Sequence, residues 1–174
     1  MEDFTIEKPG KTEYAEYYEQ YVSAVPEGNI LRVLEQQLVD SITLLEKISE
    51  EKAGYRYAPG KWSIKQVVGH ITDAERIFAY RALRFARNDQ NRLPGFEQDD
   101  YVKWAEFDNI SLKDLALQLQ AVRQSTIYML KSFPAEAWLR RGYASNFEVS
   151  VRALAYIMAG HLQHHMEVIR TRYL

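Results

Sequence analysis

Residues 150–174 read SVRALAYIMAGHLQHHMEVIRTRYL, and this stretch decides the fold. Ser150 belongs to the residue types that favour the N-cap of a helix. From Val151 onward, apolar residues and two histidines recur three and four positions apart, which is the spacing of one face of an α-helix. The stretch therefore predicts a long amphipathic helix that continues to the end of the chain. Its buried face is expected to carry Val151, Leu154, Met158, His161, His165 and Val168.

Three earlier segments show the same apolar period. They cover about residues 29–49, residues 63–87, and a stretch that starts at Ser111 and ends before Phe133-Pro134. Ser63 and Ser111 are good N-caps for the second and third of them. Strand-like alternation is not sustained anywhere in the chain. Four amphipathic helices of this length predict an all-α fold, a four-helix bundle.

The remaining segments are expected to differ in structure. Residues 12–24 have the pattern of a short amphipathic helix. Residues 88–110 form a long connection between the second and third bundle helices, show no sustained helical period and contain Pro94-Gly95. Uncovered connections of this length are often functional lids. A short helical turn around Trp138 and a polar connection are expected before the last helix.

Length and composition suit one domain over residues 1–174, with an N-terminal extension (1–27) and the bundle (29–174). The chain is 47% hydrophobic and 26% charged, and its net charge of −2 without a basic stripe gives nucleic acid no electrostatic support as a partner. The absence of cysteine excludes disulfides, Cys-ligated zinc and a protein thiol nucleophile. Glu2 and Asp3 are unlike the start of a signal peptide, and no apolar stretch approaches the roughly 20 residues that span a bilayer. We therefore expect a cytoplasmic protein without membrane contact.

The four histidines fall in two places: His70 in the second bundle helix, and His161, His164 and His165 in the fourth. With about 100° of rotation per residue, His161 and His165 lie about 40° apart within the apolar stripe, and His164 lies about 60° to the other side of His161. His70 lies about 65° from the centre of its apolar face, within a broad buried sector. If the two helices pack together, three neutral imidazoles can converge on one ion and leave coordination positions open.

Ordinary burial is the competing interpretation, because a lone histidine on an apolar face is more often a satisfied core residue than a metal ligand. Two buried imidazoles without a shared partner, however, leave polar atoms unsatisfied at a cost of about 1–3 kcal/mol each, and a metal ion resolves this. Gly69 and Gly160 directly precede two of the histidines, although glycine inside a helix costs about 1 kcal/mol relative to alanine. This placement either indicates that a side chain there would obstruct close packing or the site, or it is a coincidence.

Two stretches around the histidines carry a resemblance to a known family. Residues 59–76, PGKWSIKQVVGHITDAER, resemble the second-helix motif of the DinB-like superfamily in its YfiT-like branch. Residues 160–165, GHLQHH, are similar to the last-helix motif of that family. Between them, Leu93-Pro94-Gly95-Phe96, followed by acidic residues and a tyrosine, matches the loop of these proteins. The likeness covers nearly the whole chain, and the two helix motifs are fairly specific as a pair.

The resemblance implies a four-helix bundle with a metal site. In the family, one histidine from the second helix and two from the fourth, four positions apart, hold a divalent ion such as nickel, zinc or iron. Carried over, these are His70, His161 and His165, whereas His164 has no ligand role. Relatives include thiol S-transferases and isomerases that use low-molecular-weight thiols, and proteins described as metal-dependent hydrolases. Because the relatives are often dimers, a homodimer is compatible with the sequence.

A site with three histidines leaves a coordination position open, which is typical of catalytic metal sites. An ion in such a site can activate water for hydrolysis or bind an external thiol as thiolate. The sequence therefore favours a metal-dependent thiol S-transferase or hydrolase that acts on a small molecule. Two other hypotheses stay open: a metal- or small-molecule-binding module without chemistry, and a purely structural role for the histidines.

The sequence names no catalytic residue beyond the candidate ligands. Asp73, one turn after His70, is the nearest acidic candidate for a general base, although a solvated charge on the helix flank is the commoner role of such a residue. Glu75 is less well oriented than Asp73 to act as a general base. Arg81 and Arg123 fall near buried sectors and could bind an anionic substrate or the carboxylates of a thiol, although ordinary ion pairs are again the commoner role.

Overall fold

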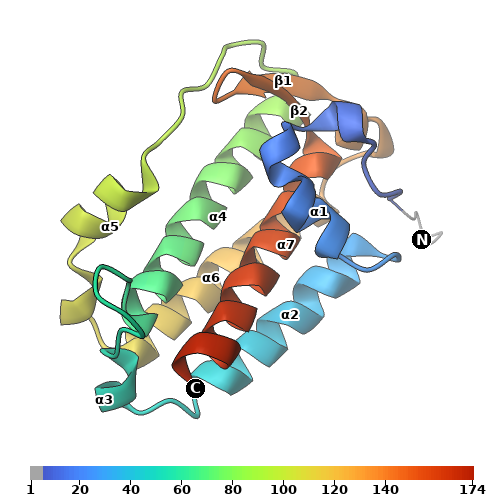
Figure 1. Cartoon of the computed structure of the whole chain (residues 1–174). Helices are drawn as coiled ribbons and strands as arrows, with labels where there is room; N and C mark the ends of the chain where they lie inside the picture. Colours follow the sequence, from blue (N-terminus) through green and yellow to red (C-terminus); the bar gives the residue numbers. More distant parts are fainter. Residues whose placement is uncertain (1–5) are drawn as a thin grey trace.

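Four long helices pack side by side in the computed structural model, which describes residues 6–174 (Figure 1). Each helix contacts two neighbours, in the cyclic order α2, α6, α4 and α7. The predicted all-α four-helix bundle is therefore confirmed. The bounds of these helices are α2, Ile30–Leu45; α4, Ile64–Ala86; α6, Leu112–Lys131; and α7, Val151–Val168.

Side-chain caps set the starts of the bundle helices where the sequence predicts them. The hydroxyl oxygens of Ser63, Ser111 and Ser150 each accept a hydrogen bond from the backbone N–H three residues further on. Asn29 caps α2 through its side-chain oxygen. These polar groups satisfy N–H groups that have no partner within the helix.

Two segments predicted as continuous helix are interrupted. α2 ends at Leu45 rather than near Ser49, because Ser49 caps a separate short helix, α3 (Glu50–Ala53). Residues 12–24 contain one α-helical stretch, α1 (Glu19–Ala24), and two 3-10 turns precede it. The prediction of one continuous helix over residues 12–24 is therefore wrong.

Contacts of Glu13 explain the interruption in the N-terminal segment. Its carboxylate accepts hydrogen bonds from Oγ of Ser150 at 2.8 Å and from two nitrogens of Arg152 at 2.7 and 2.6 Å. The backbone is extended at Tyr14, directly after Glu13. These contacts attach the extension to the start of α7 and outweigh local helix propensity. Glu2 and Asp3, which argue against a signal peptide, lie outside the described residues.

The long connection over residues 88–110 is partly helical, contrary to the sequence-based expectation. It contains α5 (Gln98–Ala105) and a 3-10 turn (Phe107–Asn109), and it runs along α4 (Figure 1). Val102 and Phe107 are buried against the bundle. A helix of eight residues is too short to show a sustained apolar period, and its packing on α4 stabilises it.

A β-hairpin replaces the polar connection expected before α7. Strand β1 (Arg141–Ala144) pairs antiparallel with β2 (Phe147–Ser150). The two residues between them, Ser145 and Asn146, both have positive φ, 53° and 68°, which is typical of a tight hairpin turn. Strands of four residues are too short for alternation to be recognised in the sequence. The expected helical turn around Trp138 is present as a 3-10 turn.

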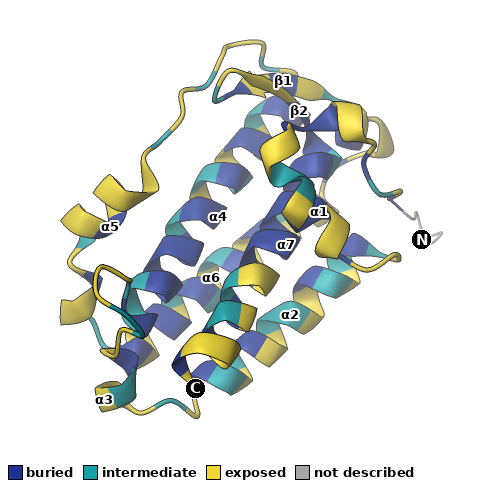
Figure 2. Cartoon of the chain, viewed as in Figure 1, coloured by how far each residue is buried: buried dark blue, intermediate teal, exposed yellow. Residues whose placement is uncertain are grey.

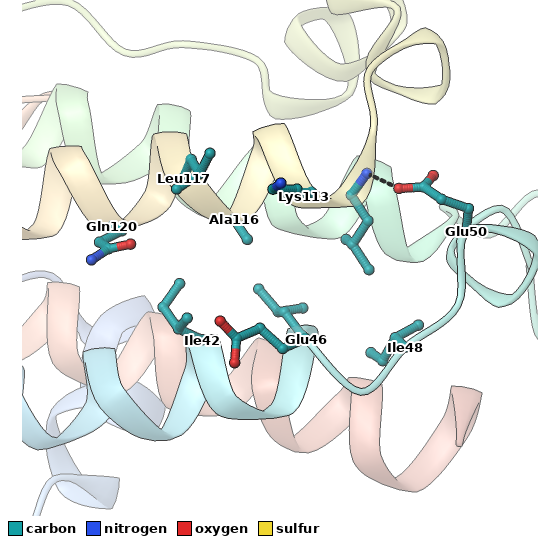
Figure 3. A pocket seen from close by; sticks show the side chains of 10 residues that line it. Ile42, Glu46, Ile48, Glu50, Lys113, Ala116, Leu117 and Gln120 are labelled. Atoms are coloured by element: carbon teal, nitrogen blue, oxygen red, sulfur yellow. Dashed lines mark hydrogen bonds between the residues drawn. The ribbon is translucent and has the colours of Figure 1, made fainter.

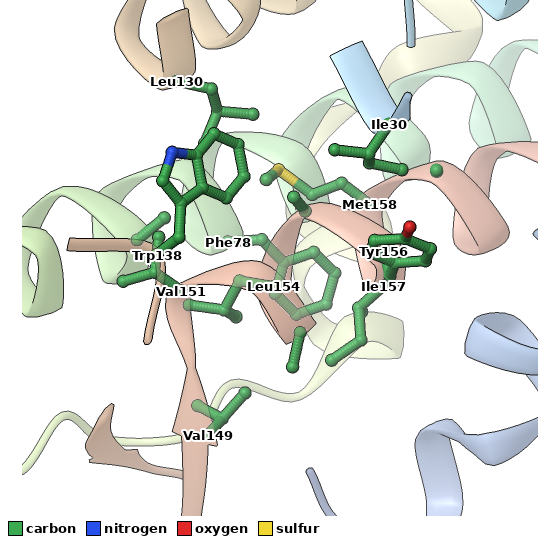
Figure 4. Close-up of a cluster of buried hydrophobic side chains, with 14 of the residues drawn as sticks. Ile30, Phe78, Leu130, Trp138, Val149, Val151, Leu154, Tyr156, Ile157 and Met158 are labelled. Carbon is green, nitrogen blue, oxygen red and sulfur yellow. The ribbon is translucent and has the colours of Figure 1, made fainter. Parts of the chain in front are cut away.

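The core consists of two clusters of buried apolar side chains. Figure 2 shows buried residues along all four bundle helices. Along α7, the first cluster extends to Ala159 and the second begins at Leu162; along α4, the second ends at Ile71 and the first begins at Ala74. His161 therefore lies where the two clusters meet. Figure 4 shows the first cluster around the N-terminal half of α7. Within residues 6–174, no helix is long and apolar enough to cross a membrane.

Candidate metal centre

Three histidine rings from two helices converge at the junction of the core clusters. Nε2 of His161 on α7 lies 3.1 Å from Nε2 of His70 on α4, and 3.1 Å from Nε2 of His165, one turn further along α7. One ring nitrogen of each histidine lies within 4.8 Å of the other two. The structure thus brings together the three predicted ligands. His164 is exposed on the flank of α7, as its helical position predicts.

Close approach of neighbouring segments explains the glycine that precedes two of these histidines. A Cβ atom at Gly160 would lie 2.0 Å from the backbone oxygen of Tyr21 on α1, and one at Gly69 would lie 2.5 Å from the ring of Phe107. The ring of Tyr21 packs edge-on against His161, with centroids 5.5 Å apart. The two glycines therefore allow α1 and the 3-10 turn after α5 to pack directly beside the site.

Burial keeps the three imidazoles neutral. It lowers the pKa of His70 to about 4, against a smaller opposing effect of Asp99, and it lowers the pKa of His165 to about 3. The pKa of His161 also lies well below its usual value, first because of burial and then because His165 and His70 are close. Neutral imidazole is the form that binds a metal ion, so at neutral pH these nitrogens need not lose a proton first.

The distances from Nε2 of His161 to the ring nitrogens of His70 and His165 fit one shared divalent ion. Bonds of about 2.0–2.1 Å to a shared ion place neighbouring ligand atoms about 3.0–3.4 Å apart, and both Nε2–Nε2 contacts, at 3.1 Å, fall in that range. Three nitrogen ligands leave one position open in a tetrahedral shell and more in a larger shell. Imidazole suits zinc, nickel and iron alike, so the ligand set does not select among these metals.

Two hollows reach the histidines. The tyrosine hollow, about 280 Å³, touches His70 and His161, and the C-terminal hollow, about 400 Å³, touches His165. Asp99, in the first turn of α5, lines both of them. The tyrosine hollow is lined by Tyr17, Tyr18, Tyr21, His70, Ala74, Phe78, Phe96, Glu97, Gln98, Asp99, Ser145 and His161, and the C-terminal hollow by Tyr57, Gly60, Lys61, Trp62, Val67, Asp99, His164, His165, Val168 and Tyr173.

Asp99 is an acidic residue beside the histidines that sequence reasoning missed. The predicted acidic candidate, Asp73, pairs instead with Arg76 at 2.8 Å and lines neither hollow. One available signal was the pair Asp99-Asp100, because acidic residues in a first turn are typical of a helix start. From that signal the sequence could have predicted a helix in the connection. The position of Asp99 beside the histidines, however, depends on the packing of α5 on α4.

Comparison with known proteins identifies the family. Residues 34–169, more than half of the chain, match the family model of the DinB superfamily. The chain belongs to the DinB superfamily. This confirms the resemblance carried by the two histidine motifs.

One solved structure is similar to this chain in fold, and one curated protein is similar to it in sequence. YfiT from Bacillus subtilis, described as "a probable metal-dependent hydrolase with an unusual four-helix bundle topology", superposes with a TM-score of 0.71 at 16% identity, over 94% of this chain and 91% of that chain. A curated protein of Oceanobacillus iheyensis, named "Putative metal-dependent hydrolase", is 27% identical over 131 residues, which are 72% of this chain and 73% of the relative.

The two buried arginines of this DinB bundle differ in their partners. Arg123 forms an ion pair with Glu75, with Nη2 2.8 Å from Oε2, which is the ordinary role expected for it. Arg81 is 3% exposed, but its Nη2 donates to the backbone oxygen of Pro94 at 2.9 Å and to Oγ of Ser145 at 3.0 Å. Among residues 6–174, no carboxylate pairs with Arg81. The ion-pair interpretation is therefore right for Arg123 and wrong for Arg81.

A third hollow lies between α2 and α6, away from the three candidate histidine ligands (Figure 3). Its volume is about 280 Å³, and Ile42, Leu45 and Ala116 contribute to a largely apolar wall. At its edge, Glu50 accepts a hydrogen bond from the backbone N–H of Leu112 at 2.6 Å, in the first turn of α6. None of the candidate ligands lines this hollow, so we assign it no part in the chemistry.

Proposed function

We propose that this protein is a metal-dependent enzyme in which His70, His161 and His165 hold one divalent ion, either nickel, zinc or iron. The proposal rests on the convergence of three neutral imidazoles, in which Nε2 of His161 lies 3.1 Å from Nε2 of both His70 and His165. The printed descriptions of YfiT and of the Oceanobacillus relative as metal-dependent hydrolases agree with it. A bound ion would lower the pKa of a coordinated water or thiol, which is the chemistry that hydrolysis and thiol transfer both need.

Thiol S-transfer to a small electrophile is the reaction that the two hollows favour. A transfer brings two molecules to one site, and the tyrosine hollow and the C-terminal hollow offer separate approaches to the histidines. Because the chain has no cysteine, the sulfur comes from an external low-molecular-weight thiol. The S–H bond of that thiol breaks, an S–C bond forms, and the leaving group departs with its electron pair. Asp99, which lines both hollows, is the side chain we assign to accept the thiol proton.

Hydrolysis is the second candidate, supported by the names of both relatives. In that reaction one hollow holds the substrate, and water takes the place of the thiol. Asp99 would then accept a proton from the attacking water. A binding module without chemistry is the remaining alternative, and it differs from both enzymes because it would hold metal without turnover.

Turnover assays with matched histidine variants test the proposal. We expect metal-dependent conjugation of a low-molecular-weight thiol to chlorodinitrobenzene or a bromobimane, abolished by His161→Ala and retained by Gln163→Ala. Gln163 is the matched control because it lies on the same helix, is exposed and lines neither hollow. Turnover of ester or amide substrates without thiol, with the same variant pattern, would identify a hydrolase instead. Metal binding without any turnover would identify the binding module, and equal turnover in His161→Ala and the unchanged protein would contradict a role for the site.

A further inference from the structure

Arg81 lies on the same face of α4 as His70. The two residues are eleven positions apart, which is about three helical turns and about 16 Å along the helix axis. Ala74 and Phe78 lie between them on that face, and both line the tyrosine hollow together with His70. Ser145, which accepts a hydrogen bond from Arg81, also lines the hollow. The tyrosine hollow therefore runs along α4 from the histidines to the partners of Arg81.

Within the described part of the chain, the hydrogen-bond partners of Arg81 are neutral groups. They are the backbone oxygen of Pro94, the hydroxyl of Ser145 and the hydroxyl of Tyr18. Burial lowers the pKa of Arg81, and only Tyr18 opposes this effect. A buried guanidinium without a counter-charge costs free energy, because the hydration lost on burial is not replaced by an opposite charge. Arg81 lies directly behind the tyrosine hollow, because its partners Tyr18 and Ser145 line the hollow that leads to the candidate metal centre.

The chain around Arg81 holds the guanidinium in place from two sides. Pro94 and Gly95 belong to the loop motif found in the sequence, and Ser145 belongs to the hairpin turn. A Cβ atom at Gly95 would lie only 3.4 Å from Oγ of Ser145, so loop and hairpin meet directly beside Arg81. Leu93 and Ala144 join the same two segments through a β-bridge. A cation fixed in this way loses little conformational freedom when it binds an anion.

We propose that Arg81 binds the carboxylate of the substrate, whose opposite end reaches His70 and His161. This inference rests on the proposed function and names its substrate class, an elongated organic acid with an apolar body. A guanidinium presents paired N–H donors that match the two oxygens of a carboxylate. Ala74 and Phe78 wall the middle of the hollow and favour an apolar body there.

The acidic side chains of the hollow favour one orientation of such a molecule. Glu97 and Asp99 both line the tyrosine hollow, and Asp99 also lines the C-terminal hollow beside His165. The negative charge of Asp99 would therefore repel a carboxylate at the histidine end of the tyrosine hollow. The anionic group of the substrate therefore belongs beside Arg81, and its uncharged reactive group belongs beside the histidines.

Calorimetric titration with phenylbutyrate and its neutral analogue phenylbutanol tests the inference. The protein is used as purified in low-salt buffer, and its metal content is measured in the same sample. We expect the affinity for the acid to be at least about tenfold higher than the affinity for the alcohol, because only the acid forms charged hydrogen bonds with Arg81. Arg81→Gln should remove this preference. Equal affinities for the two compounds, or no binding of the acid at millimolar concentration, would overturn the inference.

A matched pair at Ser145 keeps the test independent of how well Arg81→Gln folds. Asp and Asn both tolerate the positive φ of this turn residue, so both variants should keep the hairpin. Only Ser145→Asp supplies a permanent carboxylate to the guanidinium. It should lose the preference for the acid and unfold at a higher temperature than Ser145→Asn, which should keep the preference. Equal preference in the two variants would overturn the inference.

These binding measurements separate this inference from the proposed function. A protein that binds no metal but prefers the acid through Arg81 would contradict the metal-dependent enzyme and support the anion site. A protein that holds metal on its histidines and shows no preference for the acid would contradict the anion site alone.

Discussion

Glu75 of α4 and Arg123 of α6 form an ion pair inside the bundle, and their side chains are 3% and 1% exposed. Nη2 of Arg123 also donates to the backbone oxygen of Met158 on α7 at 3.5 Å, and Nη1 donates to Oε1 of Gln37 on α2 at 3.3 Å. One side chain thus joins all four bundle helices, one turn before His161. The pair therefore holds the two ligand-bearing helices in their relative positions.

Removing one partner of this pair should destabilise the fold strongly. Glu75→Gln leaves the Arg123 guanidinium buried without a counter-charge, and we expect a loss of about 3–5 kcal/mol in the free energy of unfolding. Replacing both, as Glu75→Gln with Arg123→Met, should recover much of this loss because no charge stays buried. Chemical denaturation of the single and double variants measures both effects.

The partly exposed ion pair between Asp73 and Arg76 provides the control for that experiment. Asp73→Asn should cost less than about 1 kcal/mol, because solvent screens the pair and hydrates the remaining charge. A Glu75→Gln variant no less stable than Asp73→Asn would show that the buried pair is not a structural requirement.

Asp99 should affect turnover without affecting metal binding. If it accepts the substrate proton, Asp99→Asn should lower kcat by about 10²–10⁴-fold while the metal content stays unchanged. Asp100→Asn is the matched control, since Asp100 lies in the same first turn but lines neither hollow. Assays of both variants with the same metal and thiol decide the point. Similar rates for the two variants would remove Asp99 from the mechanism.

Gly160→Ala should destabilise the protein, although alanine is the better helix former by about 1 kcal/mol. The new Cβ atom would lie 2.0 Å from the backbone oxygen of Tyr21, so α1 must move away from α7. Thermal unfolding gives the sign of the change directly. A higher melting temperature for Gly160→Ala would mean that helix propensity outweighs the contact and that α1 is not held tightly against the site.

Glu13 should make the stability depend on pH in the acid range. Burial alone would raise the pKa of Glu13, but hydrogen bonds from Arg152, the Gly10 N–H and Ser150 outweigh it and lower the pKa to about 2. The folded pKa thus lies below the unfolded value of 4.5, so the stabilisation is complete above pH 4.5 and is lost as the pH falls towards 2. After allowance for solvent screening, we expect about 1–2 kcal/mol.

Glu13→Gln isolates this contribution. The difference in the free energy of unfolding between the unchanged protein and Glu13→Gln should be largest at neutral pH and should narrow below pH 4.5. Glu16→Gln serves as the control, because Glu16 is exposed on the same N-terminal segment. A difference that stays constant down to pH 2.5 would contradict the role of the Glu13 carboxylate.

Local signals account for the parts of the fold that the sequence predicts. Serine caps and the three-and-four spacing locate α4, α6 and α7 because both depend on neighbouring residues only. The same rotation per residue places His161 and His165 on one inward face. His70 lies beside His161 and His165 because the buried faces of all four helices point into the same bundle interior.

Other parts depend on contacts between distant segments. The strands of four residues and the eight residues of α5 are too short to show a period, so the hairpin and the position of Asp99 were not predicted. The unpaired charge of Arg81 depends on a hydrogen bond to Ser145, 64 positions away. Its neighbours in sequence do not reveal that no carboxylate among residues 6–174 pairs with it. Tertiary packing, rather than local preference, thus forms the walls of the candidate site.

Elemental analysis tests the central claim most directly. Untagged protein, purified without added metal or chelator, should contain close to one equivalent of nickel, zinc or iron. His164→Ala should retain this metal, and the double variant His161→Ala/His165→Ala should lose it, because only the latter pair contributes Nε2 atoms to the cluster. No bound metal in the unchanged protein after incubation with each ion, or equal metal in the double variant, would contradict the claim that these histidines form a metal centre.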